Sequence, residues 1–237
     1  MEILITICAR GGSKGIPHKN ILKINNVPLI EYSINHAFEF SKYFKSDVAL
    51  STDSLEIKNI ANKCGLITHY IRPDSISKDT TGKIETINHL LNFEEKDKSK
   101  KYDYILDLDV SSPLRNITDL LSAFEIFTKK EDALNLFSVN DANRNPYFNM
   151  VEQNNNGFYD LVKKGSFTTR QSAPKVYELN ASFYFYRREF FFNREARTIS
   201  EKSIIYNMPH ICFDLDHSID FDFMEFLIKN NKLDFSL

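Results

Sequence analysis

Residues 1–20 read MEILITICARGGSKGIPHKN, a short apolar run followed at once by a loop rich in glycine and basic residues. The run Ile3–Cys8 has the length and the β-branched content of a buried strand. No basic segment precedes it, so we interpret it as a first strand and not as a signal peptide. Three of the seven glycines follow within residues 11–15, where backbone without side chains lets N–H groups approach an anion. The stretch predicts an α/β fold that binds an anionic ligand directly after its first strand.

Strand-like and helix-like segments alternate through the first half of the chain. Apolar residues recur at helical spacing at residues 29–40, 54–64, 84–93 and 117–127. β-rich runs predict strands at residues 47–51, 66–71 and 102–108. This order predicts βαβ units, and therefore a Rossmann-like, mainly parallel sheet with helices on both faces. In such folds, ligands bind at the carboxyl ends of the strands.

The pattern changes after about residue 138. Strand-like residues 147–152 and 158–162 flank the turn sequence NNNG at residues 154–157, which predicts a hairpin. The α/β pattern resumes with strand-like runs at residues 182–186 and 204–206 and a closing helix near residues 218–230. We therefore predict a single domain over residues 1–237 with a β-rich insertion at about residues 138–175.

The composition argues against several classes of function. The chain has 30 Lys and Arg against 32 Asp and Glu, a net charge of −2, which does not support a general binder of nucleic acids or membrane surfaces. No apolar run approaches the roughly 20 residues that a membrane span needs. The three cysteines lie far apart and in no metal-ligand spacing, so we expect reduced thiols in a cytoplasmic protein.

The loop after the first strand has the chemistry of a triphosphate site. Arg10, Lys14 and Lys19 add cationic donors to the glycine backbone, and such donors neutralise charge on a leaving pyrophosphate. The spacing matches neither GxGxxG nor GxxxxGKS/T, so a dinucleotide fold and a P-loop NTPase are not indicated. An ordinary basic turn stays open as the alternative.

Acidic residues gather near the end of the sequence. Asp214 and Asp216 would point to one face of a strand, where two adjacent carboxylates are costly without a cation between them. Mg²⁺ is the expected ion, because it prefers carboxylate and phosphate oxygens. Two alternatives stay open: a solvated edge with helix-capping acids, and a register in which Asp220 and Asp222 bind the metal.

The loop ARGGSKGIPHKN at residues 9–20 resembles the signature loop of the acylneuraminate cytidylyltransferases, the CMP-sialic acid synthetase family. Further motifs similar to those of the family follow in order along almost the whole chain. They are Ser51-Thr52-Asp53, Arg72-Pro73 with Lys78-Asp79-Thr80, Ser112-Pro113-Leu114-Arg115, Thr169-Arg170-Gln171 with Pro174 and Asn180, and the DxDxxxD pattern from Asp214 to Asp220. Each motif is weak alone, and their common order makes the resemblance specific.

The resemblance implies a fold of the nucleotide-diphospho-sugar transferase type and the transfer of CMP from CTP to a nonulosonic acid. The implied nucleotide contacts are Arg10, Gly11, Gly12, Ser13, Lys14, Lys19, Asn20, Arg72 and Lys83. The implied sugar contacts are Asp109, Arg115, Phe148, Arg170, Gln171 and Asn180. Catalysis would rest on Arg10, Lys19, Asp214 and Asp216, the last two as ligands of Mg²⁺. Lys83 departs from the family pattern, because many members have a small hydroxyl residue there.

The resemblance also implies a homodimer, in which the insertion of one subunit reaches the sugar site of the other. Phe148 stands where sialic-acid-specific members have Lys, and Glu178 where they have Arg, so positive charge is lost on the sugar side. This favours legionaminic acid as the acceptor, with a product used for a cell-surface glycan. The alternatives are a CMP-N-acetylneuraminate synthetase, a CMP-Kdo-type synthetase and, from another class, a catalytically silent nucleotide-binding regulatory protein.

Overall fold

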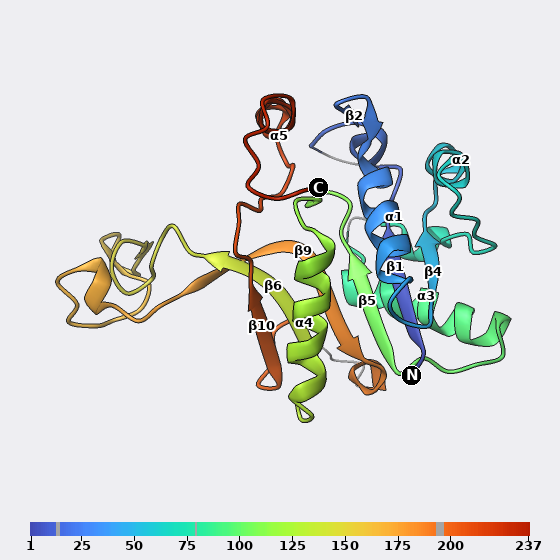
Figure 1. The fold of residues 1–237 in the computed structure, drawn as a ribbon. Helices are drawn as coiled ribbons and strands as arrows, with labels where there is room; N and C mark the ends of the chain where they lie inside the picture. The colour runs from blue at the N-terminus through green and yellow to red at the C-terminus, as the bar shows by residue number, and fades with distance from the viewer. Residues whose placement is uncertain (13–14, 79, 193–196) are drawn as a thin grey trace.

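The computed structural model describes residues 1–12, 15–78, 80–192 and 197–237, and its centre is a six-stranded sheet in the order β10-β6-β9-β5-β1-β4 (Figure 1). The strands are β1 (Ile3–Cys8), β4 (Ser46–Ser51), β5 (Tyr104–Leu108), β6 (Asn135–Asp141), β9 (Tyr177–Arg187) and β10 (Ser203–Asn207). β9 runs antiparallel to β5 and β6, and the other neighbouring pairs are parallel. The prediction of a Rossmann-like, mainly parallel sheet is therefore confirmed.

Helices cover both faces of the sheet. They are α1 (Leu29–Phe40), α2 (Leu55–Lys63), α3 (Lys83–Asp97), α4 (Ile117–Lys129) and α5 (Ser218–Lys229). Side chains alternate across β1, so that Ile3 and Ile5 pack with residues of α1 and α4 while Leu4 packs with residues of α3. Figure 1 looks onto the face covered by α1 and α4, with α3 behind the sheet. No described helix has the length and apolar character needed to cross a lipid bilayer.

Two of the incorrect sequence predictions about strands concern the central sheet. Residues 66–71 do not form a strand, although their side chains alternate between buried and exposed. The Thr68 hydroxyl donates to Leu50 O and the Arg72 amide to Thr52 O, so the segment lies along β4 without a ladder of backbone hydrogen bonds. The second error was an omission, because β6 was not predicted. It contains the buried polar residues Asn135 and Ser138, which weaken the apolar signal.

Residues 142–176, which we call the arm, leave the sheet between β6 and β9 (Figure 1). The Ala142 amide donates to Val176 O (3.2 Å) at the base of the arm. Inside it, β7 (Val151–Gln153) and β8 (Tyr159–Leu161) form an antiparallel hairpin whose turn places Gly157 at a φ of +83°, a conformation that favours glycine. The expected insertion began at residue 138, but residues 138–141 continue β6, with residues 139–141 paired to β9.

Candidate active site

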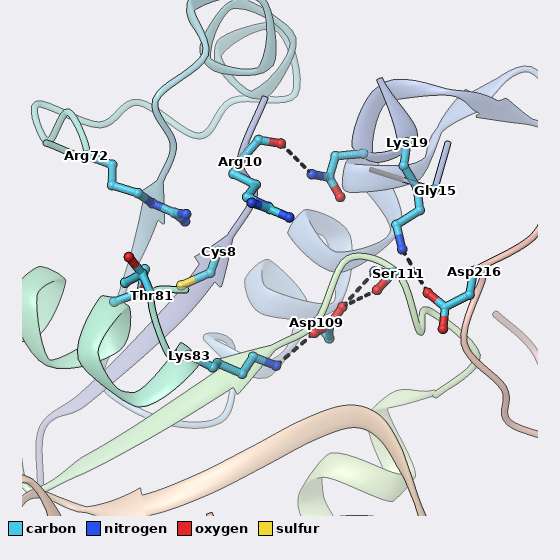
Figure 2. Close-up of a pocket in the computed structure, with 12 residues that line it drawn as sticks. Cys8, Arg10, Gly15, Lys19, Arg72, Thr81, Lys83, Asp109, Ser111 and Asp216 are labelled. Carbon is cyan, nitrogen blue, oxygen red and sulfur yellow. Dashed lines mark hydrogen bonds and ion pairs between the residues drawn. The ribbon is translucent and has the colours of Figure 1, made fainter. Parts of the chain in front are cut away.

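A cavity of about 450 Å³ opens at the carboxyl ends of β1, β4 and β5 (Figure 2). Its lining residues are Cys8, Arg10, Gly15, Lys19, Asn20, Arg72, Thr81, Lys83, Thr86, Asp109, Ser111 and Asp216. Figure 2 shows Lys83 and Lys19 approaching from opposite sides, with Arg10 and Asp109 between them. The position at the strand ends is the one expected for a ligand site in this class of fold.

The glycine-rich loop is anchored on the end of β1. The Arg10 carbonyl accepts a hydrogen bond from Asn20 Nδ2 (3.0 Å), and the Gly11 amide donates to Asp53 Oδ1 (2.7 Å). The Gly11 amide is therefore already occupied. A Cβ added at Gly12 would meet no atom of the described residues within 4 Å, its chain neighbours aside. The predicted contacts Ser13 and Lys14 lie outside the described residues.

Lys19 and Arg72 bring two further cations to the cavity. Lys19 belongs to a short 3₁₀ turn (Lys19–Ile21), and its Nζ lies 3.1 Å from Asp216 Oδ1. Arg72 is 6% exposed, with Nε donating to Ser51 Oγ (2.9 Å) and Nη2 to Ser51 O (2.7 Å) at the end of β4. Both side chains are thus held in place by neighbours from β4 or from the acidic segment that precedes α5.

Lys83, the first residue of α3, pairs with two carboxylates, of which Asp107 lies in β5 and Asp109 directly after the end of this strand. Its Nζ lies 2.9 Å from Asp107 Oδ2 and 2.8 Å from Asp109 Oδ2, and 4.4 Å from the ring centroid of Tyr184. Burial alone would lower the pKa of Lys83, but the two carboxylates raise it well above its ordinary value. Burial likewise works against ionised Asp109, whose pKa is nevertheless lowered to about 2 by Lys83 and by two hydrogen bonds from Ser111.

Asp214 and Asp216 lie on an irregular segment before α5, and the strand predicted at this position is absent. The two aspartates are separated by one residue of the core. That residue, Leu215, is fully buried. Asp214 Oδ1 is buried and has no hydrogen-bond donor among the described residues. Burial, together with the charges of Asp109 and Asp216, raises the pKa of Asp214 to about 7. Asp220 accepts hydrogen bonds from the backbone amides of Asp216 and His217 and thereby caps α5, which argues against the alternative metal register.

The structure corrects the predicted sugar contact of Arg115. The side chain is fully buried, and its Nη atoms donate to Asp109 O, Ser112 O, Ser182 O, Ser182 Oγ and Ser33 Oγ at 2.6–3.2 Å. Burial lowers the pKa of Arg115 to about 10. An acceptor carboxylate cannot reach a guanidinium that is enclosed in this way, so Arg115 connects β9, α1 and the loop after β5.

Asn180 is corrected for the same reason. It is 4% exposed, its amide nitrogen donates to Asn140 Oδ1 (2.6 Å), and its amide oxygen accepts from Ser138 Oγ (2.6 Å) and from the Ser182 amide (3.2 Å). These bonds hold the irregular stretch of β9 where the pairing with β6 shifts register. The neighbouring Ala181 has a φ of +56°, which is unusual for a residue with a side chain.

The other predicted sugar contacts lie on the arm. Arg170 and Gln171 are exposed and line a second cavity of about 380 Å³, together with Asn143, Asn145 and Lys175. Phe148 lies half-buried in the turn that precedes β7. Among the described residues, none lines both this second cavity and the first one. Within one chain, the predicted sugar contacts are therefore divided between the first cavity, the interior and the arm.

Five residues that line the first cavity were not predicted as contacts: Cys8, Gly15, Thr81, Thr86 and Ser111. Cys8 ends β1 and Ser111 follows β5, so the rule that ligands bind at carboxyl strand ends could have indicated both. Thr86 lies in the first turn of α3, where no motif marks it.

Comparison with known proteins places these observations in a family. The sequence profile described as cytidylyltransferase matches residues 4–234. The chain is 42% identical to post-translational flagellin modification protein B of Campylobacter coli and 40% identical to CMP-N,N′-diacetyllegionaminic acid synthase of Campylobacter jejuni, in each case over 98% of this chain and 97% of the relative. The structure of CMP:2-keto-3-deoxy-manno-octonic acid synthetase complexed with CTP aligns with a TM-score of 0.68 at 13% identity, covering 98% of this chain and 100% of that one. A likeness this distant in sequence concerns the fold alone.

Proposed function

The chain belongs to the cytidylyltransferase family, and from this we propose that it joins CMP from CTP to a nonulosonic acid, N,N′-diacetyllegionaminic acid, with release of pyrophosphate. The observation that carries the choice of acceptor is the 40% identity, along nearly the whole chain, to a relative with the name of that synthase. The cavity with Arg10, Lys19, Arg72 and Lys83 at the strand ends supports the nucleotide half of the reaction.

In the proposed reaction, the anomeric hydroxyl oxygen of the acceptor attacks the α-phosphorus of CTP. A new P–O bond forms, the bond to the β-phosphate oxygen breaks, pyrophosphate leaves with the electron pair, and the hydroxyl proton passes to solvent. Arg10 and Lys19 would hold the phosphates and compensate for the negative charge that develops on the leaving group. Positioning and charge neutralisation of this kind account for most of the catalysis in such transfers.

Mg²⁺ is part of the proposal, and the acidic residues fit it. Asp214 Oδ1 is buried without a donor among the described residues, and burial together with the neighbouring carboxylates raises the pKa of Asp214. A divalent cation would stabilise this arrangement. Asp214 and Asp216 would hold the ion, which, when bound, supplies positive charge to the phosphates. Two carboxylates completed by phosphate oxygens and water are a common Mg²⁺ environment.

We further propose a homodimer in which the arm of one subunit supplies Arg170 to the acceptor site of the other. The arm extends away from the sheet and exposes apolar side chains, Val151, Phe158 and Tyr159 among them, which supports a surface for association. Arg170 also lines no part of the nucleotide cavity of its own chain. A bidentate guanidinium is suited to the carboxylate of a nonulosonic acid.

Mixing two inactive variants tests this arrangement. Arg170→Met and Asp214→Asn each remove one side of the site, so we expect each homodimer to be inactive. When the two are unfolded together and refolded as a mixture, half of the dimers combine both chains, and each of these has one intact site if Arg170 acts across the interface. Turnover of about a quarter of wild type would then return, whereas no recovery, with dimers present by light scattering, would refute action across the interface.

Pyrophosphate release tests the reaction itself. The enzyme is supplied with CTP and Mg²⁺ and with legionaminic, N-acetylneuraminic, pseudaminic or 3-deoxy-octulosonic acid in turn. We expect the highest kcat/KM with N,N′-diacetyllegionaminic acid. A clear preference for N-acetylneuraminic acid would overturn the acceptor, and silence with every acid despite CTP binding would overturn the proposed activity.

We also propose that the enzyme works in the cytoplasm. Cys8, Cys64 and Cys212 are all free thiols, as is typical of a reducing compartment. Fractionation of the source cells would test this location, and recovery outside the cytoplasmic fraction would contradict it.

A further inference from the structure

The segment that carries Asp214 and Asp216 has no regular secondary structure, so contacts with other elements hold it in place. It comprises residues 208–217, between β10 and α5. Its backbone is bonded at its start, where the Met208 amide donates to β6 (2.8 Å), and between the two aspartates, where the Leu215 amide donates to the loop after β5 (2.8 Å). The position of Asp214 therefore depends on what holds the stretch between these two points.

His210 makes a charged contact in this stretch. Its Nδ1 lies 3.0 Å from Ile211 O, and a carbonyl oxygen only accepts, so Nδ1 carries a proton. Its Nε2 lies 2.8 Å from Oδ2 of Asp119, which also accepts from the Asn116 amide (2.8 Å). Asp119 belongs to the first turn of α4, where the helix dipole favours an ionised carboxylate. Both ring nitrogens therefore donate, and His210 is an imidazolium paired with a carboxylate.

This ion pair is enclosed by three elements of the fold. The His210 side chain is 4% exposed and that of Asp119 is 2% exposed. Phe235, from the tail after α5, stacks on the imidazole with centroids 3.7 Å apart, and Figure 1 shows the C-terminus close to the start of α4. Asn140 Nδ2, from β6, donates to His210 O (3.3 Å). Removal of one partner of a buried pair is costly, because the other is left unpaired.

Asp119 belongs to the same part of the chain as the wall of the first cavity. The loop after β5 leads from Asp109 through Ser111 into α4, and the Ser111 amide and hydroxyl both donate to Asp109 Oδ1 at 2.8 Å. The acidic segment is thus attached twice to this loop and helix, once at the Ser111 carbonyl and once at Asp119. Asp214 lies between the two attachments.

We propose that His210, paired with Asp119, is a positioning residue that holds Asp214 and Asp216 in the geometry required by the divalent cation. Mg²⁺ demands near-ideal octahedral coordination, and such sites tolerate displacements of only about 0.5 Å. Among the described residues that line the first cavity, His210 is absent, so it acts through the backbone of the acidic segment. This inference rests on the proposed metal site.

Binding of Mn²⁺, a spectroscopic substitute for Mg²⁺, tests the proposal in the nucleotide-free enzyme. Electron paramagnetic resonance of the free ion gives dissociation constants for the wild type, Asp214→Asn and His210→Ala. Residues that act on a site through others typically shift its affinity roughly 2- to 30-fold. We expect His210→Ala to raise the dissociation constant about tenfold. An unchanged constant in this variant would overturn the proposal.

Arg187→Met is the matched control, because Arg187 holds the opposite end of α4. Its Nη2 donates to Phe127 O (3.4 Å) and Lys130 O (3.3 Å). The control should lower the Tm and leave the affinity for Mn²⁺ unchanged. If Arg187→Met weakens Mn²⁺ binding as much as His210→Ala does, the effect is one of stability alone and the proposal fails.

Rescue by a second cation tests the ion pair itself. His210→Lys places an ammonium opposite Asp119 and should recover most of the lost affinity for Mn²⁺. No recovery would overturn the role of the pair. His210→Gln, which keeps a donor but not the charge, replaces His210→Ala if that variant does not fold, and it should also weaken Mn²⁺ binding.

Asp214→Asn separates this inference from the proposed function. If the metal site is wrong, Asp214→Asn binds Mn²⁺ as the wild type does. If only the inference is wrong, Asp214→Asn loses the ion while His210→Ala binds it with the affinity of the wild type.

Discussion

Replacement of Arg115 by Met should lower the free energy of unfolding and should not change the binding of the acceptor directly. The guanidinium donates to three backbone carbonyls and two serine hydroxyls in a fully buried position. Hydrogen bonds to charged groups are worth about 1.5–3 kcal/mol each, and orphaned buried acceptors add to the cost. The carbonyls keep other donors, however: Ser33 Oγ on Asp109 O, Ser182 Oγ on Ser112 O and the Asp109 amide on Ser182 O.

These remaining donors, together with relief from burying a charge, reduce the loss to about 3 kcal/mol of unfolding free energy. For a chain of this size, that corresponds to a Tm lowered by about 6–12 °C. Urea denaturation followed by circular dichroism measures the change. Arg170→Met is the matched control, because this exposed arm residue should cost less than about 0.5 kcal/mol. A stable Arg115→Met enzyme with only a raised KM for the acceptor would refute the reasoning.

Three further predictions concern pH and the glycine-rich loop. Burial and two neighbouring carboxylates raise the pKa of Asp214 from 3.8 to about 7, so the stabilising contribution of its protonated form is lost as pH rises through 7. Without metal, Asp214→Asn should therefore raise the Tm more at pH 8 than at pH 5, while pyrophosphate release falls. An equal gain in Tm at both pH values would contradict this. Burial lowers the pKa of His210, but its 2.8 Å bond to Asp119 raises it above 6.5 overall. The cost of His210→Gln in denaturant should therefore be largest below pH 6.5 and shrink as pH rises through the folded pKa, so a cost independent of pH would argue against a charged pair. Gly11→Ala should lower the Tm, because its Cβ would lie 3.0 Å from the Cβ of Ser54. Gly12→Ala should not, because its Cβ would meet no atom of the described residues within 4 Å, its chain neighbours aside. Equal melting curves for the two variants would show that the loop adapts.

The sequence predicted the elements that obey simple periodicity. β1 and α1 have the predicted bounds, because both are apolar where they face the core and their neighbours are clear turn or capping signals. β6 failed this reasoning, since Asn135 and Ser138 are buried through hydrogen bonds to Thr198 O and Asn180 Oδ1, contacts made far along the chain. No local pattern reveals such a partner.

The residues of the site also fall into those that the sequence could place and those that it could not. Residues of the glycine-rich loop could be placed from the sequence because they follow β1 directly, and the strand end fixes their position. The pairing of Lys83 with Asp107 and Asp109 could not, because it depends on how α3 packs on β1 and β4, beside β5, and because Asp109 follows Lys83 by 26 residues. A basic residue at the start of a helix is also unfavourable, because the helix dipole places partial positive charge there. The sequence shows this conflict but not the two carboxylates that neutralise the lysine.

The positions of Arg115 and Arg170 limit how the acceptor can be recognised. From the sequence, both were equally suitable for binding a carboxylate, because they have the same side chain. Only the tertiary structure decides which guanidinium is enclosed. With Arg115 occupied by backbone carbonyls, the arm holds the exposed guanidinium among the predicted acceptor contacts, and the arm cavity shares no residue with the nucleotide cavity. If the first cavity binds the nucleotide and Arg170 binds the acceptor, as we propose, a reaction that joins both substrates at one phosphorus atom requires that the two cavities be brought together. Association of two chains through the arm meets this requirement without a change in the fold of either one, which is why the mixing experiment bears on the chemistry as much as on the oligomeric state.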